Sequence, residues 1–397
     1  TVIMQTMRNV YHSDIYQFNK PVSSYWEATS SENLNLDKLQ KDISSEIVVI
    51  GGGYTGLLCA INLIENYNLD VVLVEAGKVG WGASSRNAGF CCLPPSKMSY
   101  KKMQSVYGRE ETKKFFKNSV EGANYTKKLI DNYNIDCDVT GENNFVVAHH
   151  KNKFDQIKDQ AEVYKSEFGI ETKVYTKEEF DEVGHGGNEQ FGAFSYKPGF
   201  AINPLKFVNG LAKHALSKKL KIFEHTKVDK IDKENGSYLL RTGEGSIKTK
   251  KIIVATNGFY QEGLIPEMDG RVLPVISNII VTRPLTDEEL SLHNFNTYAP
   301  IANSKNLLYY YRKLPDNRIL FGTRGDFEGS DQSNQNRAND MEKFLKNIFP
   351  KWSNVTIDYN WRGLIALSQK LTPSIGKIDN EEIYYGFGYS GVGVSAA

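Results

Sequence analysis

Short apolar runs separated by a helical stretch mark the first part of this chain. Ile47–Ile50 and Val71–Val74 are continuous apolar segments, and the residues between them begin with a glycine-rich turn at 51–56. Apolar runs of this length, bounded by turn residues, are typical of buried parallel strands. The pattern therefore predicts an α/β fold that begins with a strand–helix–strand unit.

The rest of the chain alternates between helical and strand patterns. Helical spacing covers the ranges 101–135, 151–168, 203–218 and 338–349. Strand patterns cover 144–148, 191–196, 220–224, 226–231, 237–242, 251–255, 273–282, 306–312 and 318–322. Asn203 and Pro204 have the residue types expected at the start of a helix. We expect a discontinuous dinucleotide-binding domain (1–100, 200–265 and 355–397) and a substrate domain (101–199 and 266–354) built on a mainly antiparallel sheet.

The glycine-rich turn has the spacing of a dinucleotide-binding fingerprint. Gly51 permits a tight turn, Gly53 lets the backbone approach a pyrophosphate, and Gly56 lets the helix pack closely on the strand. Glu75 follows Gly56 by 75 − 56 = 19 residues, near the spacing of a carboxylate that binds ribose hydroxyls. Such a carboxylate repels a 2′-phosphate and disfavours NADP. The segment predicts an adenine dinucleotide, with Tyr54 and Thr55 at its phosphates.

Composition narrows the class of protein further. The 397 residues carry a net charge of +1, with no basic run, so nucleic acid is not an expected partner. No apolar run approaches the ~20 residues of a membrane span, and the first residues do not resemble a secretory leader. The four cysteines, at 59, 91, 92 and 137, lack metal-ligand spacing. We expect a cytoplasmic protein with reduced thiols and no metal site.

The segment after Glu75 separates FAD from NAD. Glu75-Ala76 followed by Gly82–Gly89 resembles the flavin loop of the D-amino-acid-oxidase-like superfamily of FAD-dependent oxidoreductases (glycine/sarcosine oxidase type), and within it the gamma-glutamylputrescine oxidase branch. The resemblance spans about residues 20–397. Further matching segments are 24–29, 253–258, 308–312, 318–324, 361–363, 372–376 and 388–394.

This resemblance implies a Rossmann-type FAD-binding domain of the GR2-like class and a non-covalent FAD. It places Arg86 beside the flavin or its phosphates, and the backbone N–H groups of 388–393 where they stabilise negative charge on the reduced ring. The further cofactor contacts that it implies are Ala76, Gly82, Ala83, Ser84, Ser85, Asn87, Ala88, Gly89, Val228, Asn257, Gly258, Trp361, Gly363, Gly388, Tyr389, Ser390, Gly391, Val392 and Gly393.

The resemblance also implies an activity. A small primary or secondary amine, such as a glutamylated polyamine or an N-methylated amino acid, loses hydride to flavin N5, the imine is hydrolysed, and O₂ reoxidises the flavin to give H₂O₂. The candidate substrate-orienting residues are Arg324, Tyr309, Tyr310, Tyr311, Trp361 and Tyr389. Tyr309 and Tyr311 share one face of a strand and Tyr310 takes the other, and the sequence does not decide which face meets the flavin.

Several alternatives stay open at this point. An amine dehydrogenase of the same fold would pass electrons to a quinone or a flavoprotein. A flavin-bearing structural protein without catalysis and an NAD-dependent dehydrogenase are further options. No oxygen-activating lysine can be assigned, and Lys370 stands where relatives commonly carry Asp. Members of the family usually continue beyond a position equivalent to Ala397, so we expect an incomplete C-terminus.

Overall fold

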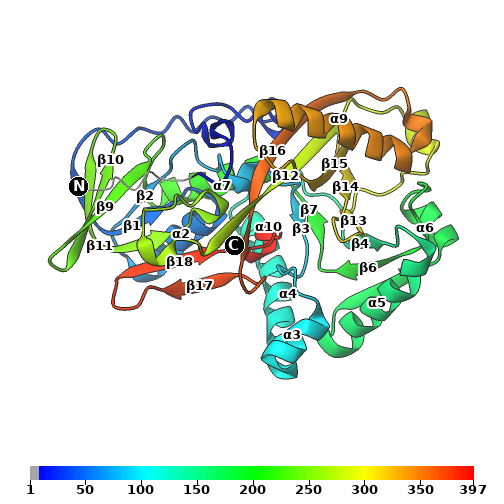
Figure 1. Cartoon of the computed structure of the whole chain (residues 1–397), viewed down its shortest axis with the longest axis horizontal. Helices are drawn as coiled ribbons and strands as arrows, with labels where there is room; N and C mark the ends of the chain where they lie inside the picture. Colours follow the sequence, from blue (N-terminus) through cyan, green and yellow to red (C-terminus); the bar gives the residue numbers. More distant parts are fainter. Residues whose placement is uncertain (1–8) are drawn as a thin grey trace.

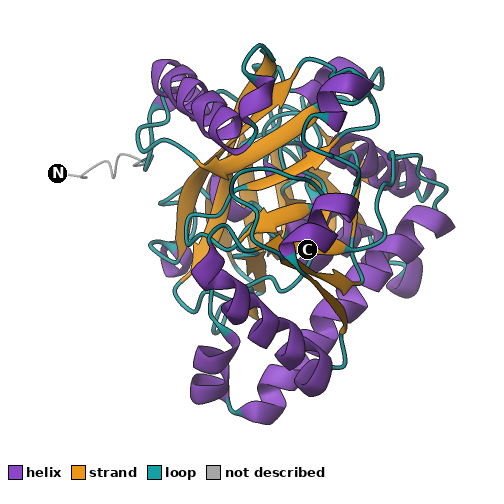
Figure 2. Ribbon diagram, turned by 90° about the vertical axis from the view of Figure 1, so that its right-hand side faces the viewer, coloured by secondary structure: helices purple, strands orange, loops and turns teal. Residues whose placement is uncertain are grey.

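The computed structural model describes residues 9–397, so the expectation about a leader segment at 1–8 lies outside the described residues. Two eight-stranded sheets lie side by side (Figure 1). Helices cover the outside of this arrangement (Figure 2). None of the helices between residues 9 and 397 is both long and apolar enough to cross a membrane.

The first sheet contains the predicted strand–helix–strand unit. Its order is β17-β18-β11-β1-β2-β8, with β10 and β9 attached to β11 as an antiparallel meander. The strands are β1 (Ile43–Ile50), β2 (Val71–Val74), β8 (Lys221–Phe223), β9 (Val228–Glu234), β10 (Ser237–Thr242), β11 (Ser246–Val254), β17 (Ser374–Lys377) and β18 (Ile383–Phe387). The central strands are parallel, and Val48, Val49 and Leu73 are fully buried, as expected for strands covered on both faces.

Two helices cover one face of this sheet. α2 (Tyr54–Tyr67) follows the glycine turn, and α7 (Pro204–Ser217) packs beside it. The Asn203 side chain accepts a hydrogen bond from the Lys206 N–H, which confirms the predicted cap with Pro204 in the first turn. Because α2 follows β1 directly through the glycine turn, its N-terminus lies at the carboxyl edge of β1 and β2. Ligands of such folds bind at this edge.

The second sheet is mainly antiparallel, as predicted. Its order is β16-β12-β15-β14-β13-β4-β6-β5, and only β13 and β4 pair in parallel. The strands are β4 (Asn144–Val147), β5 (Glu171–Tyr175), β6 (Ala193–Lys197), β12 (Val272–Thr282), β13 (Ile301–Asn303), β14 (Tyr310–Lys313), β15 (Ile319–Arg324) and β16 (Ile357–Ser368). α9 (Asp331–Ile348) covers one face near β12, β15 and β16, which leaves the other face toward the first sheet (Figure 1).

The remaining elements are short or lie at the periphery. β3 (Phe90–Cys91) and β7 (Phe200–Ala201) form a two-stranded ribbon between the sheets. The other helices are α1 (Tyr25–Thr29), α3 (Tyr100–Tyr107), α4 (Arg109–Asn132), α5 (Phe154–Phe168), α6 (Lys177–Val183), α8 (Asp287–Ser291) and α10 (Gly393–Ala396).

Two predicted boundaries need correction. Residues 357–368, assigned from the sequence to the dinucleotide domain, form β16 and pair with β12 from Val272↔Ser368 to Thr282↔Ile357. Trp361 and Gly363, which the family resemblance implies as cofactor contacts, therefore lie in the middle of a long strand of the second sheet. α9 begins at Asp331, earlier than the predicted 338, because the Ser330 side chain accepts a hydrogen bond from the Ser333 N–H and caps the helix there.

Candidate active site

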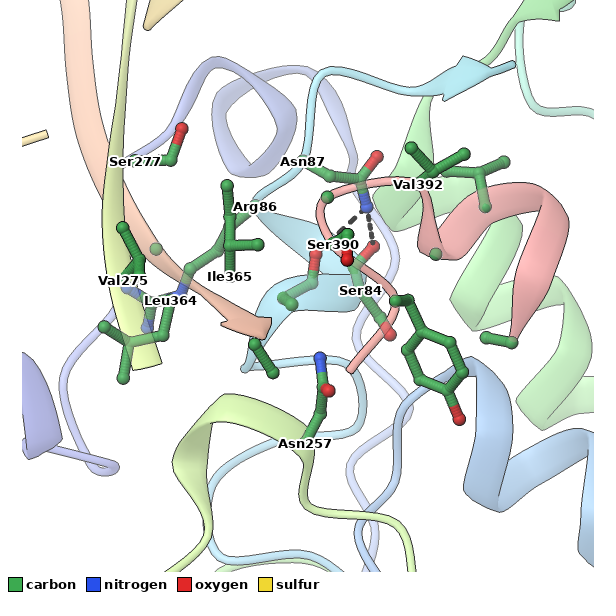
Figure 3. A pocket seen from close by; sticks show the side chains of 18 of the residues that line it. Ser84, Arg86, Asn87, Asn257, Val275, Ser277, Leu364, Ile365, Ser390 and Val392 are labelled. Carbon is green, nitrogen blue, oxygen red and sulfur yellow. Dashed lines mark hydrogen bonds between the residues drawn. The ribbon is translucent and has the colours of Figure 1, made fainter. Parts of the chain in front are cut away.

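A large cavity lies between the two sheets. It measures about 1360 Å³, above the roughly 300–1,000 Å³ typical of small-molecule pockets. Side chains from the connecting loops and from the second sheet, among them Ser84, Asn257 and Ser277, gather around it (Figure 3). A cavity of this size has room for a dinucleotide and a second molecule.

The glycine turn forms one end of the cavity. Gly51 has φ +114°, and a Cβ on it would lie 2.5 Å from the Ala255 carbonyl oxygen. A Cβ on Gly56 would lie 1.9 Å from the Gly51 oxygen, so Gly56 lets α2 pack against the turn and does not itself line the cavity. Gly53, Tyr54 and Thr55 do line it, at the positive end of the α2 dipole.

Glu75 holds the shape of this turn. Its two carboxylate oxygens accept hydrogen bonds from the Gly52 N–H and the Gly77 N–H, both at 2.8 Å. The side chain is buried, and burial raises the pKa of the carboxyl group. Glu75, Ala76 and Val228 line the cavity beside the turn, where a ribose would lie.

We expect Glu75→Gln to weaken both the fold and cofactor retention. An amide offers one acceptor oxygen, so one of the two backbone N–H groups loses its partner, at a cost of about 1–3 kcal/mol. Thermal melting of the apoprotein and the FAD dissociation constant measure the two effects. Unchanged values for both would contradict the role we give to this carboxylate. Glu46→Gln, on the exposed side of β1, is the matched control.

The loop at 82–89 is held by its own side chains. The Ser84 hydroxyl accepts from the Tyr54 N–H at 3.0 Å, and Asn87 Nδ2 donates to the carbonyl oxygens of Ala83 and Ser84. Arg86 Nε donates to the Trp81 carbonyl, and its guanidinium lies 4.1 Å from the centre of the Trp81 indole. Burial lowers the pKa of Arg86 to about 9. Gly82, Ala83, Ser84, Arg86, Asn87 and Ala88 line the cavity.

The C-terminal loop closes the same region. Tyr389, Ser390, Gly391, Val392 and Gly393 line the cavity. The Thr55 hydroxyl donates to the Tyr389 hydroxyl at 2.9 Å, and the Gly388 N–H donates to Asn257 Oδ1 at 3.0 Å. Asn257 and Gly363 also line the cavity, so segments far apart in the sequence converge here.

Six predicted cofactor residues do not line the cavity, namely Gly56, Ser85, Gly89, Gly258, Trp361 and Gly388. Trp361 Nε1 donates to the Arg86 carbonyl oxygen at 2.8 Å, so it supports the loop from behind. Gly89 has φ +76°, and its Cβ would lie 2.0 Å from the Ile202 oxygen. Trp361 and Gly89 therefore shape the loops that surround the cavity.

The inner face of the second sheet forms the opposite wall. The Tyr310 hydroxyl lies 2.8 Å from Ser277 Oγ, and burial raises the pKa of Tyr310 to about 12. The Tyr310 ring lies over Gly322, where a Cβ would stand 2.1 Å from the ring. Arg324 also lines this wall, and no carboxylate of residues 9–397 pairs with its side chain.

The predicted substrate contacts at Tyr309 and Tyr311 must be corrected. Tyr311 is 2% exposed, and its hydroxyl lies 2.8 Å from His185 Nε2 in the core beneath the sheet. The Tyr309 ring stacks on Phe344 of α9 at 5.6 Å. Side chains alternate along a strand, and α9 covers the face that carries Tyr309 and Tyr311. Of the two strand faces that the sequence left open, the one that carries Tyr310 therefore meets the cavity.

The residues present fit an adenine dinucleotide. Gly51 and Gly53 of the glycine turn line the cavity, and the N-terminus of α2 points at that space. Thr256 Oγ1 lines the cavity, is buried, and has no hydrogen-bond partner among residues 9–397. An additional ligand with oxygen atoms would satisfy it.

Comparison with known proteins decides the family. The sequence model of the FAD dependent oxidoreductase family (DAO) matches residues 46–397, which is most of the chain. This chain belongs to that family. It is therefore an enzyme, an oxidoreductase that depends on FAD, and the predicted family, fold class and cofactor are confirmed.

Individual relatives agree with this membership. The chain is 30% identical to gamma-glutamylputrescine oxidoreductase of Escherichia coli K12 over 374 residues, 94% of this chain and 85% of that protein. Glycine oxidase from Geobacillus kaustophilus has a TM-score of 0.70 at 17% identity and covers 89% of this chain and 91% of its own. L-proline dehydrogenase from P. horikoshii also has a TM-score of 0.70, at 23% identity, over 90% of each chain. These structures support the fold.

Proposed function

We propose that this FAD-dependent oxidoreductase oxidises an amine at the carbon next to nitrogen. The observation that carries this proposal is the continuous cavity from the glycine turn to the wall with Tyr310 and Arg324. When bound, FAD supplies a two-electron acceptor for hydride. The protein then needs to bind the substrate, orient it and keep the amine neutral.

Arg324 and Tyr310 have the chemistry for this task. A nearby guanidinium disfavours a second positive charge, so Arg324 lowers the pKa of a bound ammonium and increases the neutral amine that can release hydride. A substrate with a carboxylate beside the amine would also find a bidentate partner in Arg324. The Tyr310–Ser277 pair supplies polar hydrogen-bonding atoms on the same wall.

The substrate candidates are a glutamylated polyamine and an N-methylated amino acid. The relative from E. coli supports the first, because gamma-glutamylputrescine gives that protein its name. O₂ is the proposed acceptor, with release of H₂O₂, and an electron-transfer partner in its place would make the enzyme a dehydrogenase. We further propose that FAD is held without a covalent bond and that the enzyme works in the cytoplasm.

Oxygen uptake by the purified holoenzyme tests the proposal. The panel contains gamma-glutamylputrescine, putrescine, sarcosine, dimethylglycine and glycine, each measured with and without catalase. We expect uptake with at least one amine, and catalase should return half of the oxygen as H₂O₂ is consumed. Amine-dependent reduction of a quinone dye without oxygen uptake would favour the dehydrogenase. A holoenzyme that oxidises none of the amines with either acceptor would remove the amine assignment.

A further inference from the structure

The cavity continues well beyond the wall with Tyr310. Its lining follows the second sheet from β15 across β14 and β13 to β4 and β6, represented by Arg324, Tyr310, Ala302, Asn144 and Tyr196. Arg324 lies on β15 and Asn144 on β4, and β14 and β13 lie between these two strands. Three inter-strand spacings of the usual 4.8 Å separate the two strands by about 14 Å. We call the far part the distal chamber and define it by Cys92, Lys97, Asn144, Gln160, Tyr164 and Tyr196.

Asn144 presents an unused acceptor in this chamber. Its side chain is 3% exposed, and Nδ2 donates to the Cys91 carbonyl oxygen at 3.0 Å. This hydrogen bond fixes the orientation of the amide, because a flipped amide would bring two oxygens together. Asn144 lines the chamber, and its Oδ1, which is itself buried, has no hydrogen-bond partner among residues 9–397. It therefore calls for a ligand that donates an N–H or O–H.

Lys97 presents an uncompensated cation in the same chamber. Of the three lysines that line the cavity, Lys227 pairs with Asp229 and Lys305 with Glu189, whereas Lys97 pairs with no carboxylate in the described chain. Its loop is fixed, since the Lys97 N–H and the Ser96 hydroxyl both donate to the Leu371 carbonyl oxygen.

The neighbours of Lys97 do not supply the missing negative charge. Burial raises the pKa of the Cys92 thiol to about 12, so this thiol is neutral near pH 7. Burial likewise raises the pKa of the Tyr164 hydroxyl to about 12 and raises that of the Tyr196 hydroxyl well above its usual value. The Lys97 side chain is exposed, and a ligand carboxylate that reached its ammonium would form a charge-assisted hydrogen bond.

We propose that the distal chamber binds the amino-acid end of an elongated amine substrate. Lys97 takes its carboxylate and Asn144 Oδ1 accepts from its N–H, while the reacting amine lies near Arg324 and Tyr310. This inference rests on the proposed amine oxidation. In such a substrate, roughly nine bonds between the reacting amine and the α-carbon of the amino-acid end span about 11 Å. This length suits the separation of about 14 Å between the strands of Arg324 and Asn144, because the side chains on both strands reach into the cavity. The chamber thus selects amines with an α-amino-acid group at the far end.

The test compares substrates that differ only at the far end. Gamma-glutamylputrescine carries the amino-acid group, and N-acetylputrescine has the same amide and reacting amine without it. Loss of a charge-assisted contact of about 1.5–3 kcal/mol corresponds to roughly a 10- to 150-fold change. We expect Lys97→Met to lower kcat/KM for gamma-glutamylputrescine by that factor, mainly through KM, and to leave N-acetylputrescine unchanged. Lys97→Arg should restore most of the loss, and Lys101→Met, on the exposed side of α3, is the matched control.

A binding measurement separates this inference from the proposed function. Gamma-glutamylbutylamide has the amino-acid end but no terminal amine, so its Kd for the holoenzyme can be measured by calorimetry without turnover. We expect Lys97→Met to raise this Kd by about the same factor. Equal Kd values for wild type and Lys97→Met, or equal kcat/KM for the two putrescine derivatives, would overturn the inference. Lys97-dependent binding in an enzyme that oxidises no amine would instead refute only the amine oxidation.

Discussion

Replacing Gly56 by alanine should give a destabilised protein that is purified without FAD. The new Cβ would lie 1.9 Å from the Gly51 carbonyl oxygen, and both partners belong to the backbone, so α2 and the turn must move apart. Overpacking of this kind costs about 1–3 kcal/mol or more, and the displaced turn no longer forms the cofactor cradle. Thermal melting and the ratio of flavin to protein absorbance measure both consequences.

Gly53→Ala is the matched control for this prediction. Its Cβ would meet only the Ser84 hydroxyl at 2.7 Å, the movable end of a side chain. Losing the bond from the Tyr54 N–H to that hydroxyl costs only about 1 kcal/mol, while the methyl group enters the space left for phosphates. We expect near-normal apoprotein stability with weaker FAD binding. A Gly56→Ala protein that melts like wild type and retains FAD would contradict the packing argument.

The second large effect is expected at Arg324. Arg324→Met removes an unpaired cation from the substrate wall, and a charge-assisted hydrogen bond is worth about 1.5–3 kcal/mol, or roughly 10- to 150-fold in kcat/KM. This loss should appear for amines whose carboxylate lies next to nitrogen, such as sarcosine. For every amine substrate, the rising limb of the pH profile should move to higher pH, because the bound ammonium loses a neighbour that lowers its pKa.

Arg271→Met is the control for Arg324, because Arg271 is exposed and does not line the cavity. The pH profile is the decisive readout, since a structural defect would lower activity at every pH. If short amino-acid ligands bound Arg324→Met as tightly as wild type and the profile did not move, Arg324 would have no role at the substrate.

Local chemistry explains which parts of the site the sequence could predict. The positions of Gly51, Gly56 and Glu75 depend on backbone geometry within one strand–helix–strand unit, so spacing alone indicates them. Which face of β14 meets the cavity depends on which face α9 covers. Tyr310 and Tyr311 lie on opposite faces of this strand, so both faces carry the same residue type. Hydrophobic patterning could not choose between them.

The distal chamber shows the other limit of sequence reasoning. Asn144 and Lys97 are 47 residues apart (144 − 97), and the sheet order together with the loop after β3 brings both to one cavity. No local motif marks either residue. An asparagine at the start of a predicted strand and a lysine in a loop are ordinary surface patterns. The folded protein singles them out because Asn144 Oδ1 is buried without a partner among residues 9–397 and both residues line one cavity.

The most direct test of the account is an anaerobic titration of the holoenzyme with gamma-glutamylputrescine while the flavin absorbance is followed. We predict that the oxidised flavin band bleaches at about one equivalent of substrate and returns when air is admitted. A flavin band that persists at excess gamma-glutamylputrescine, and with each of the other amines, would contradict the proposed amine oxidation.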